Sequence, residues 1–248
     1  MTVELPSVTV SEHEGVRYLH LGDTPWIQGA MLMRSPHVLV LEYVQRMMAW
    51  MLWRDCAALT QGRAVQLGLG AGAITRFCHH VLGLPHCTAV ELNPEVIAAC
   101  RHAFAMPPDN ARLVVVQADA ARWIAEAVRG SRIDALQVDL YDQEAAAPVH
   151  DSAAFYAGCH AALAPGGLLA VNLFGRHASF ERSAACIVAA FGRDQVWRLR
   201  PTREGNTIVI AARGVATPSR ETLLARAATI ERDYGLPARK WLRLVQPC

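Results

Sequence analysis

Residues 64–72 read AVQLGLGAG, a short apolar run that leads into a glycine-rich loop. The run is typical of a buried strand, and the residues after it predict a helix that extends to Val81. Glycines in this position leave room for a ligand beside the backbone, and the helix N-terminus is a favourable place for a polar ligand. The stretch therefore predicts the nucleoside-binding loop of an α/β protein, with a tight turn as the alternative for the glycines alone.

The chain beyond this loop repeats the alternation of short apolar runs and helical stretches. Further strands are expected over 88–91, 113–117, 133–139 and 168–173, with helices between them. This rhythm favours a Rossmann-like α/β fold with a doubly wound, mostly parallel sheet. Two later strands flank a turn around Gly205 and predict a C-terminal antiparallel hairpin at the edge of that sheet.

Three parts are predicted along the chain. Residues 1–34 read as a small β unit, 35–62 as a connecting helix and 63–248 as the Rossmann-like domain. The helix is expected to be capped by Ser35 and to begin at Pro36, because proline is well tolerated as a first helical residue.

The composition argues against several classes of function. The 248 residues are 52% hydrophobic and 19% charged, with a formal net charge of +2, and no long basic run offers a footprint for nucleic acid. We expect no signal peptide, because the first residues, MTVEL, form neither a cationic nor an apolar region. We expect no membrane contact, because the most apolar stretch, residues 38–53, is short and carries Glu42 and Arg46. The seven cysteines are scattered without a Cys-x-x-Cys pair, so we expect no metal site and a cytoplasmic protein.

Acidic residues stand where successive predicted strands end. Glu91 closes the strand after the glycine loop, at the roughly 20-residue offset where a carboxylate can accept both hydroxyl hydrogens of a ribose. Asp119 follows the third strand, where it can accept a hydrogen bond from the amine of adenine, and Asp139 follows the fourth. Ligands of open parallel sheets bind beyond the carboxyl ends of the strands, so these residues predict a nucleoside site. The loop also fits the dinucleotide fingerprint G-x-G-x-x-A, which keeps NAD as an alternative.

An ordered set of motifs carries a resemblance to a known family. The motifs are LGLGAG at 67–72, AVELNPEV at 89–96, QADA at 117–120, VDLYD at 138–142 and LAPGGLL at 163–169. In this order and spacing the sequence resembles the spermidine synthases (polyamine aminopropyltransferases), within the larger class of S-adenosylmethionine-binding proteins. The resemblance covers residues 16–211 and includes the small N-terminal β unit.

The resemblance implies a set of site residues. Carried over by position, the cofactor-binding residues would be Gly68, Gly70, Gly72, Glu91, Asp119 and Ala120. Glu91 would hold the ribose, and the pair Asp119 and Ala120 would hold the adenine. Asp139 would be the catalytic aspartate. The substrate-binding residues would be Asp142, Tyr141 and Gln28, with Gln28 beside the cofactor. A homodimer is also implied.

These residue types suit the implied chemistry, which is the transfer of an aminopropyl group from decarboxylated S-adenosylmethionine to an amine such as putrescine. An alkyl group on a sulfonium is displaced in line, and the leaving thioether needs no acid. A free alkylamine has a pKa of about 10.4 and arrives protonated, so the enzyme must take up a proton. Asp139 can bind the ammonium and act as general base, while Asp142 can orient the amine.

Two departures from the family pattern keep alternatives open. Ala71 stands where the family carries an aspartate that faces the amino end of decarboxylated S-adenosylmethionine. Residues 143–148, QEAAAP, replace the family's Pro-x-Gly-Pro gate. An S-adenosylmethionine-dependent methyltransferase of the same fold is therefore one alternative, and a non-catalytic nucleoside-binding protein is another.

Overall fold

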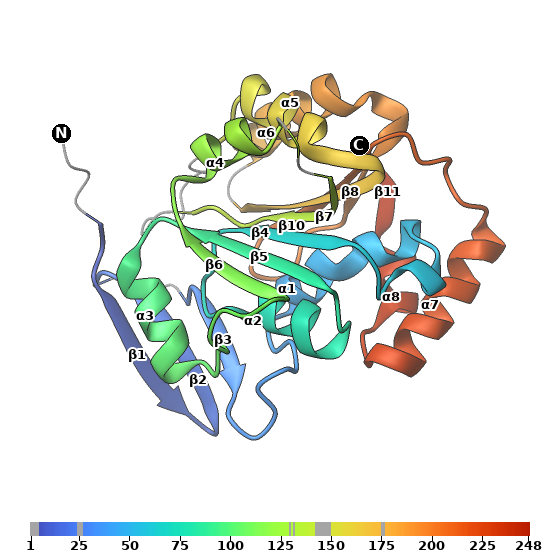
Figure 1. Cartoon of the computed structure of the whole chain (residues 1–248). Coiled ribbons are helices and arrows are strands. Elements are labelled where there is room, and N and C mark those ends of the chain that lie inside the picture. Colours follow the sequence, from blue (N-terminus) through green and yellow to red (C-terminus); the bar gives the residue numbers. More distant parts are fainter. Residues whose placement is uncertain (1–4, 24–26, 129, 131, 142–149, 175–176) are drawn as a thin grey trace.

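A computed structural model of the chain describes residues 5–23, 27–128, 130, 132–141, 150–174 and 177–248 (Figure 1). The large sheet has eight strands in the order β11-β9-β10-β8-β7-β4-β5-β6. Its parallel strands are β4 (Arg63–Leu67), β5 (His86–Glu91), β6 (Leu113–Gln117), β7 (Ile133–Val138) and β8 (Leu163–Phe174). The Rossmann-like, doubly wound sheet predicted from the sequence is confirmed.

The predicted C-terminal hairpin is formed by β9 (Val196–Leu199) and β10 (Asn206–Ala212), and β10 lies antiparallel to β8. The hairpin is not the edge of the sheet, however. A short strand, β11 (Val245–Pro247), pairs with β9 and forms that edge. Three residues show no alternation of apolar and polar side chains, so β11 could not be recognised in the sequence.

Helices cover both faces of the large sheet (Figure 1). One face packs against α4 (Ala120–Ala127), α5 (Ala153–Ala162) and α6 (His177–Phe191). The other packs against α2 (Ala73–Arg76) with the π-turn Phe77–Val81, α3 (Pro94–Ala103), α7 (Arg220–Tyr234) and α8 (Ala238–Leu242). Alternation along β10 shows the two faces directly, because Ile208 and Ile210 enter one apolar core while Val209 and Ala211 enter the other.

The N-terminal unit is a three-stranded antiparallel sheet of β1 (Val8–His13), β2 (Val16–Leu21) and β3 (Gly29–Leu32). It is tied to the large domain at α3. The Val8 N–H donates to Glu95 Oε2 at 2.9 Å, and Asn93 Nδ2 donates to the Pro6 carbonyl at 2.8 Å. These contacts hold the small sheet over the carboxyl end of β5.

The connecting helix begins later than predicted. The α-helix α1 starts at Glu42 and runs to Met47, followed by the 3₁₀ segment Met48–Trp53, whereas Pro36 lies in a turn. The turn is fixed from outside, because the Pro36 carbonyl accepts a hydrogen bond from Arg76 Nε at 3.0 Å. Every residue of the 3₁₀ segment is buried. Among the described residues, no helix combines the length and apolar character needed to cross a membrane.

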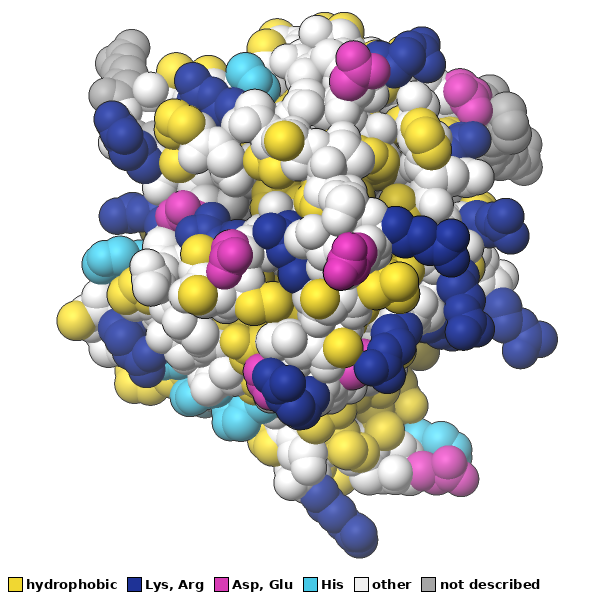
Figure 2. Space-filling view, turned by 90° about the vertical axis from the view of Figure 1, so that its right-hand side faces the viewer, with side chains coloured by type: hydrophobic (Ala, Val, Ile, Leu, Met, Phe, Trp, Pro, Cys, Tyr) yellow, Lys and Arg dark blue, Asp and Glu magenta, His cyan; other side chains and the backbone are white. Residues whose placement is uncertain are grey.

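Figure 2 shows basic side chains spread over the side of the molecule that carries α7 in Figure 1, with acidic and apolar side chains between them.

Candidate active site

A cleft of about 860 Å³ lies at the carboxyl ends of the parallel strands. Its walls come from the N-terminal unit, from α1, from the segments that follow β4, β5, β6 and β7, from the end of β8, and from the β9–β10 turn. The chain order of the sheet reverses between β4 and β7, which is where open α/β sheets bind their ligands. A cavity therefore lies beside the strand-end residues that predict a ligand site.

Two of the three predicted glycines form part of the cleft. Gly68 and Gly70 line it, and both have positive φ angles, +85° and +51°. A Cβ on Gly68 would lie 2.0 Å from the Asp139 carbonyl oxygen, and one on Gly70 would lie 2.9 Å from the Gln28 carbonyl oxygen. Glycine is needed here so that β7 and the N-terminal unit can approach the loop.

Gly72 lies behind the cleft rather than on it. It is the N-cap of α2, with φ +69°, and a Cβ there would lie 2.5 Å from Met106 Cε. The close approach of Met106 and the left-handed backbone conformation are sufficient reasons for a glycine here, and no ligand contact is needed to explain it.

Glu91 lines the cleft with a carboxylate that main-chain groups hold in place. The Leu69 N–H donates to Oε2 and the Asn93 N–H donates to Oε1, both at 2.9 Å. Burial raises the pKa of Glu91, against the opposing effect of these N–H groups. Each carboxylate oxygen can accept more than one hydrogen bond, so Glu91 can still receive the two hydroxyls of a ribose.

Asp119 stands at the end of β6 and caps α4. Its Oδ1 accepts the Arg122 N–H at 2.8 Å, and its Oδ2 lies 3.0 Å from His150 Nε2. Burial pushes the pKa of Asp119 upward, but the Arg122 N–H and His150 together hold it below its ordinary value. Ala120, the first residue of α4, lines the same part of the cleft.

Asp139 follows β7 and lies in the cleft at the centre of a side-chain network. Asn172 Nδ2 donates to Asp139 Oδ1 at 2.8 Å, and Asn206 Nδ2 donates to Asn172 Oδ1 at 3.1 Å. Burial raises the pKa of Asp139, while hydrogen bonds from Asn172 and Tyr43 lower it. The net rise brings this carboxylate closer to the pKa that a general base requires near neutral pH.

Tyr141 presents its ring rather than a free hydroxyl to the cleft. The hydroxyl donates to the Asn172 carbonyl at 3.0 Å and accepts the N–H of Phe174. The Tyr141 and Phe174 rings meet edge to face, with centroids 6.3 Å apart. Together they form an aromatic wall beside Asp139. Asp142, the second predicted aspartate, lies outside the described residues.

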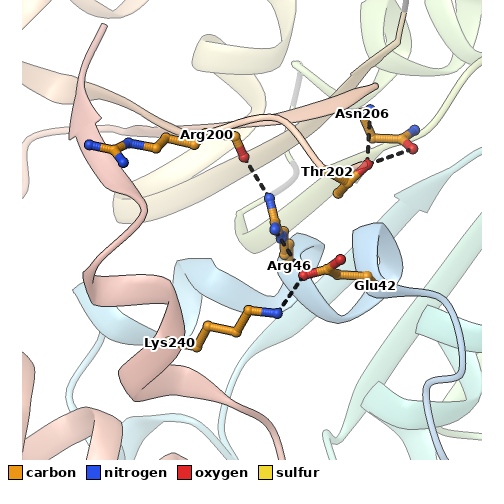
Figure 3. Close-up of polar contacts among 6 residues, drawn as sticks. All are labelled: Glu42, Arg46, Arg200, Thr202, Asn206 and Lys240. Atoms are coloured by element: carbon orange, nitrogen blue, oxygen red, sulfur yellow. Dashed lines mark hydrogen bonds and ion pairs between the residues drawn. The ribbon is translucent and has the colours of Figure 1, made fainter. Parts of the chain in front are cut away.

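Glu42 lines the cleft from α1 but is held by two cations (Figure 3). Its Oε1 accepts Arg46 Nη2 and Lys240 Nζ, each at 2.8 Å. Hydrogen bonds from Lys240 and then Arg46 lower the pKa of Glu42. Arg46 also donates to the carbonyl of Arg200, so α1 is connected both to α8 and to the segment after β9.

No group of three or more His, Cys, Asp or Glu residues in the described part of the chain is arranged to hold a metal ion. The polar groups of the cleft are instead carboxylates, amides and hydroxyls, which suit a charged organic ligand.

Comparisons with known proteins identify the family of the chain. Over 240 residues the chain is 31% identical to the polyamine aminopropyltransferase of Neisseria meningitidis serogroup A, covering 96% of the chain and 88% of the relative. It is 32% identical over 233 residues to the enzyme of the same name from Chromobacterium violaceum, covering 94% and 86%. The chain belongs to the polyamine aminopropyltransferase family. It is a transferase, and the resemblance stated from its motifs is confirmed.

Solved structures with low sequence identity to the chain have the same fold. A probable spermidine synthase from Corynebacterium glutamicum matches with a TM-score of 0.71 at 21% identity, covering 97% of the chain and 92% of that structure. Human methyltransferase-like protein 13, solved with SAH, matches with a TM-score of 0.70 at 22% identity, covering 78% and 92%. No protein-family model matches the chain.

Three residues that line the cleft were not found by sequence analysis, namely Tyr43, Asn172 and Asn206. His150 also lines it. From the sequence, His150 could touch a substrate from a loop or cap, although an ordinary role is the preferred interpretation. Asn172 did carry a signal, because it is a buried amide inside an otherwise apolar strand, and such a group needs a partner. Tyr43 and Asn206 have ordinary surroundings in the sequence and reach the cleft only through tertiary folding.

Proposed function

We propose that the chain transfers the aminopropyl group of decarboxylated S-adenosylmethionine to a small amine such as putrescine. Membership of the family supports aminopropyl transfer in general. The observation that carries the finer proposal is Asp139, a carboxylate of raised pKa held in the cleft by Asn172 and Tyr43. In the strand order, β7 leads to Asp139 and lies between β8, which ends at Phe174, and the strands β5 and β6, which lead to Glu91 and Asp119.

The proposed reaction is a single displacement. The amine lone pair forms the new N–C bond as the C–S bond of the sulfonium breaks, and its electron pair stays on sulfur in neutral methylthioadenosine. The acceptor arrives as an ammonium ion with a pKa of about 10.4 and must lose a proton. Asp139 accepts this proton, and the enzyme's remaining contribution is to hold the two reactants in line.

The proposed binding roles follow the strand ends. Glu91 takes the ribose hydroxyls, Asp119 and Ala120 take the adenine, and Gly68 and Gly70 give the nucleoside room beside the backbone. Gly72 supports the loop from behind. For the acceptor, Gln28 and the ring of Tyr141 line its path, and Asp142 orients its amine.

A methyltransferase reaction with ordinary S-adenosylmethionine is the second candidate, and Ala71 is the observation that favours it. Ala71 is 2% exposed, and a Cβ on Gly29 would lie 2.5 Å from its Cβ. Its carbonyl accepts a hydrogen bond from Arg76, a fully buried cation whose pKa burial lowers to about 10. This part of the loop offers no acidic side chain to the amino end of a donor.

Calorimetric titration with S-adenosylmethionine, its decarboxylated form and methylthioadenosine tests the two candidates. Tight binding of the decarboxylated form and of methylthioadenosine supports aminopropyl transfer, and a panel of diamines then identifies the acceptor. A preference for ordinary S-adenosylmethionine would instead favour methyl transfer. Failure to bind any of the three would contradict both.

We also propose a homodimer in the cytoplasm. The sequence resemblance supports the dimer, and the seven free cysteines support a reducing compartment. Sedimentation and cell fractionation are the direct tests.

A further inference from the structure

His150 lies on the wall of the cleft next to Asp119, at the end where the proposed function places the adenine. Its Nε2 is 3.0 Å from Asp119 Oδ2, and the two side chains are 24% and 40% exposed. The imidazole also packs on Phe155, with ring centroids 5.5 Å apart and planes inclined by 32°. The ring is therefore held both at its polar edge and at its face.

The contacts on Asp119 restrain the rotation of its carboxylate. Oδ1 accepts the Arg122 N–H in the first turn of α4, and Oδ2 accepts a hydrogen bond from His150 Nε2. Rotation about the side chain would break both the hydrogen bond that caps α4 and the hydrogen bond to His150. A carboxylate fixed at both oxygens is an acceptor of fixed direction.

An acceptor of fixed direction can distinguish two purine bases. Adenine presents an amine donor at position 6, whereas hypoxanthine presents a carbonyl oxygen there. A fixed carboxylate pairs with the amine and repels the carbonyl oxygen, and a site built for one hydrogen bond rejects a ligand that leaves it unmade. A carboxylate free to turn could move away from position 6 and accept the N1–H of hypoxanthine instead, so it would lose much of this discrimination.

We propose that His150 is a positioning residue for base selection, which fixes Asp119 so that the cleft accepts adenine nucleosides and rejects hypoxanthine nucleosides. This inference rests on the proposed function, because it takes the nucleoside to lie against Asp119. His150 acts on the base through Asp119 and takes no part in the displacement.

The test is calorimetric titration of purified variants with methylthioadenosine and methylthioinosine. His150→Leu removes the donor but keeps an apolar group on Phe155, and we expect the preference for methylthioadenosine to fall by about tenfold, the value of one hydrogen bond. His150→Gln restores an N–H donor in the place of Nε2 and should recover most of that preference. His160→Leu is the matched control, since His160 packs on Phe191 at 4.9 Å but does not line the cleft.

A ratio of affinities separates base selection from a structural role, because general damage weakens both nucleosides alike. An unchanged ratio in His150→Leu, or equal weakening of both ligands, would overturn the inference while leaving the proposed function intact. If the wild-type protein binds neither nucleoside, the proposed function and the inference both fail.

Discussion

The two ends of the cleft are built in different ways. At the proposed nucleoside end, main-chain N–H groups hold the carboxylates, with Leu69 and Asn93 on Glu91 and Arg122 on Asp119. His150 is the side chain that adds to these contacts, on Asp119. At the acceptor end, side chains from separate elements hold Asp139, with Asn172 from β8 and Tyr43 from α1. The backbone contacts come with the fold, whereas the side-chain contacts can be removed one at a time. The first end should resist substitution of its neighbouring side chains, with His150 as the exception, and the second should respond to each substitution.

The largest effect is expected for Asp139→Asn. Removing the proposed base should lower kcat by roughly 10²–10⁴-fold with little change in nucleoside affinity. Because burial raises the pKa of Asp139, the wild-type rate should fall as the pH drops through a value above that of an ordinary carboxyl. The variant should lose this acid limb. Asp134→Asn, on the same strand but paired with Arg54 outside the cleft, is the control and should keep the wild-type pH profile.

Glu91→Gln should act on binding rather than on turnover. In the wild-type protein each carboxylate oxygen accepts a backbone N–H. In the variant, the NH₂ group of the amide replaces one of these oxygens, so two hydrogen-bond donors face each other. We expect the dissociation constant for methylthioadenosine to rise on the order of tenfold to a hundredfold. Glu95→Gln is the matched control, because Glu95 lies four residues on and outside the cleft. Equal affinities of the two variants would contradict the role given to Glu91.

Asn172→Ala should lower kcat less than Asp139→Asn does, and it should shift the pH–rate profile in a direction that identifies its cause. Its amide lowers the pKa of Asp139, so its loss should raise that pKa further and move the acid limb of the rate profile to higher pH. We expect a loss of about tenfold in kcat near neutral pH. Asn206→Ala, one hydrogen bond farther away, should shift the limb in the same direction by less. If the acid limb of the pH–rate profile does not move in either variant, side chains do not control Asp139 and the contrast between the two ends of the cleft is wrong.

Lys240→Met should have the smallest effect. Lys240 is 61% exposed, and exposed ion pairs contribute about 1 kcal/mol or less to stability. Glu42 keeps Arg46 in this variant, so α1 should stay in place and the Michaelis constant of the acceptor should not change (Figure 3). Thermal denaturation and steady-state kinetics would check both statements. A large change in acceptor affinity would show that Glu42 contacts the amine directly.

The nucleoside end was more predictable from the sequence than the acceptor end, for a physical reason. Gly68, Glu91 and Asp119 each stand at a strand end, and parallel strands bring their carboxyl ends to one edge. Their positions follow from counting elements along the chain. Asn172 and Tyr43 reach Asp139 from elements whose relative placement depends on packing, which no local pattern encodes.

The N-terminal segment illustrates the same limit. Ser35 and Pro36 form a valid helix start by local rules, yet the helix starts at Glu42 because Arg76 binds the Pro36 carbonyl from another element. A tertiary hydrogen bond therefore overrides a local preference. The division of the chain at residues 34 and 62 stays a prediction.

The most direct test of the account is the identity of the products. Wild-type protein would be incubated with putrescine and either decarboxylated or ordinary S-adenosylmethionine. The products would then be separated by chromatography, and mass spectrometry would identify and quantify them. The account predicts methylthioadenosine and an aminopropylated amine in equal amounts from the decarboxylated donor, and loss of both with Asp139→Asn. Methylated amine and S-adenosylhomocysteine from the ordinary donor, with no product from the decarboxylated one, would contradict it.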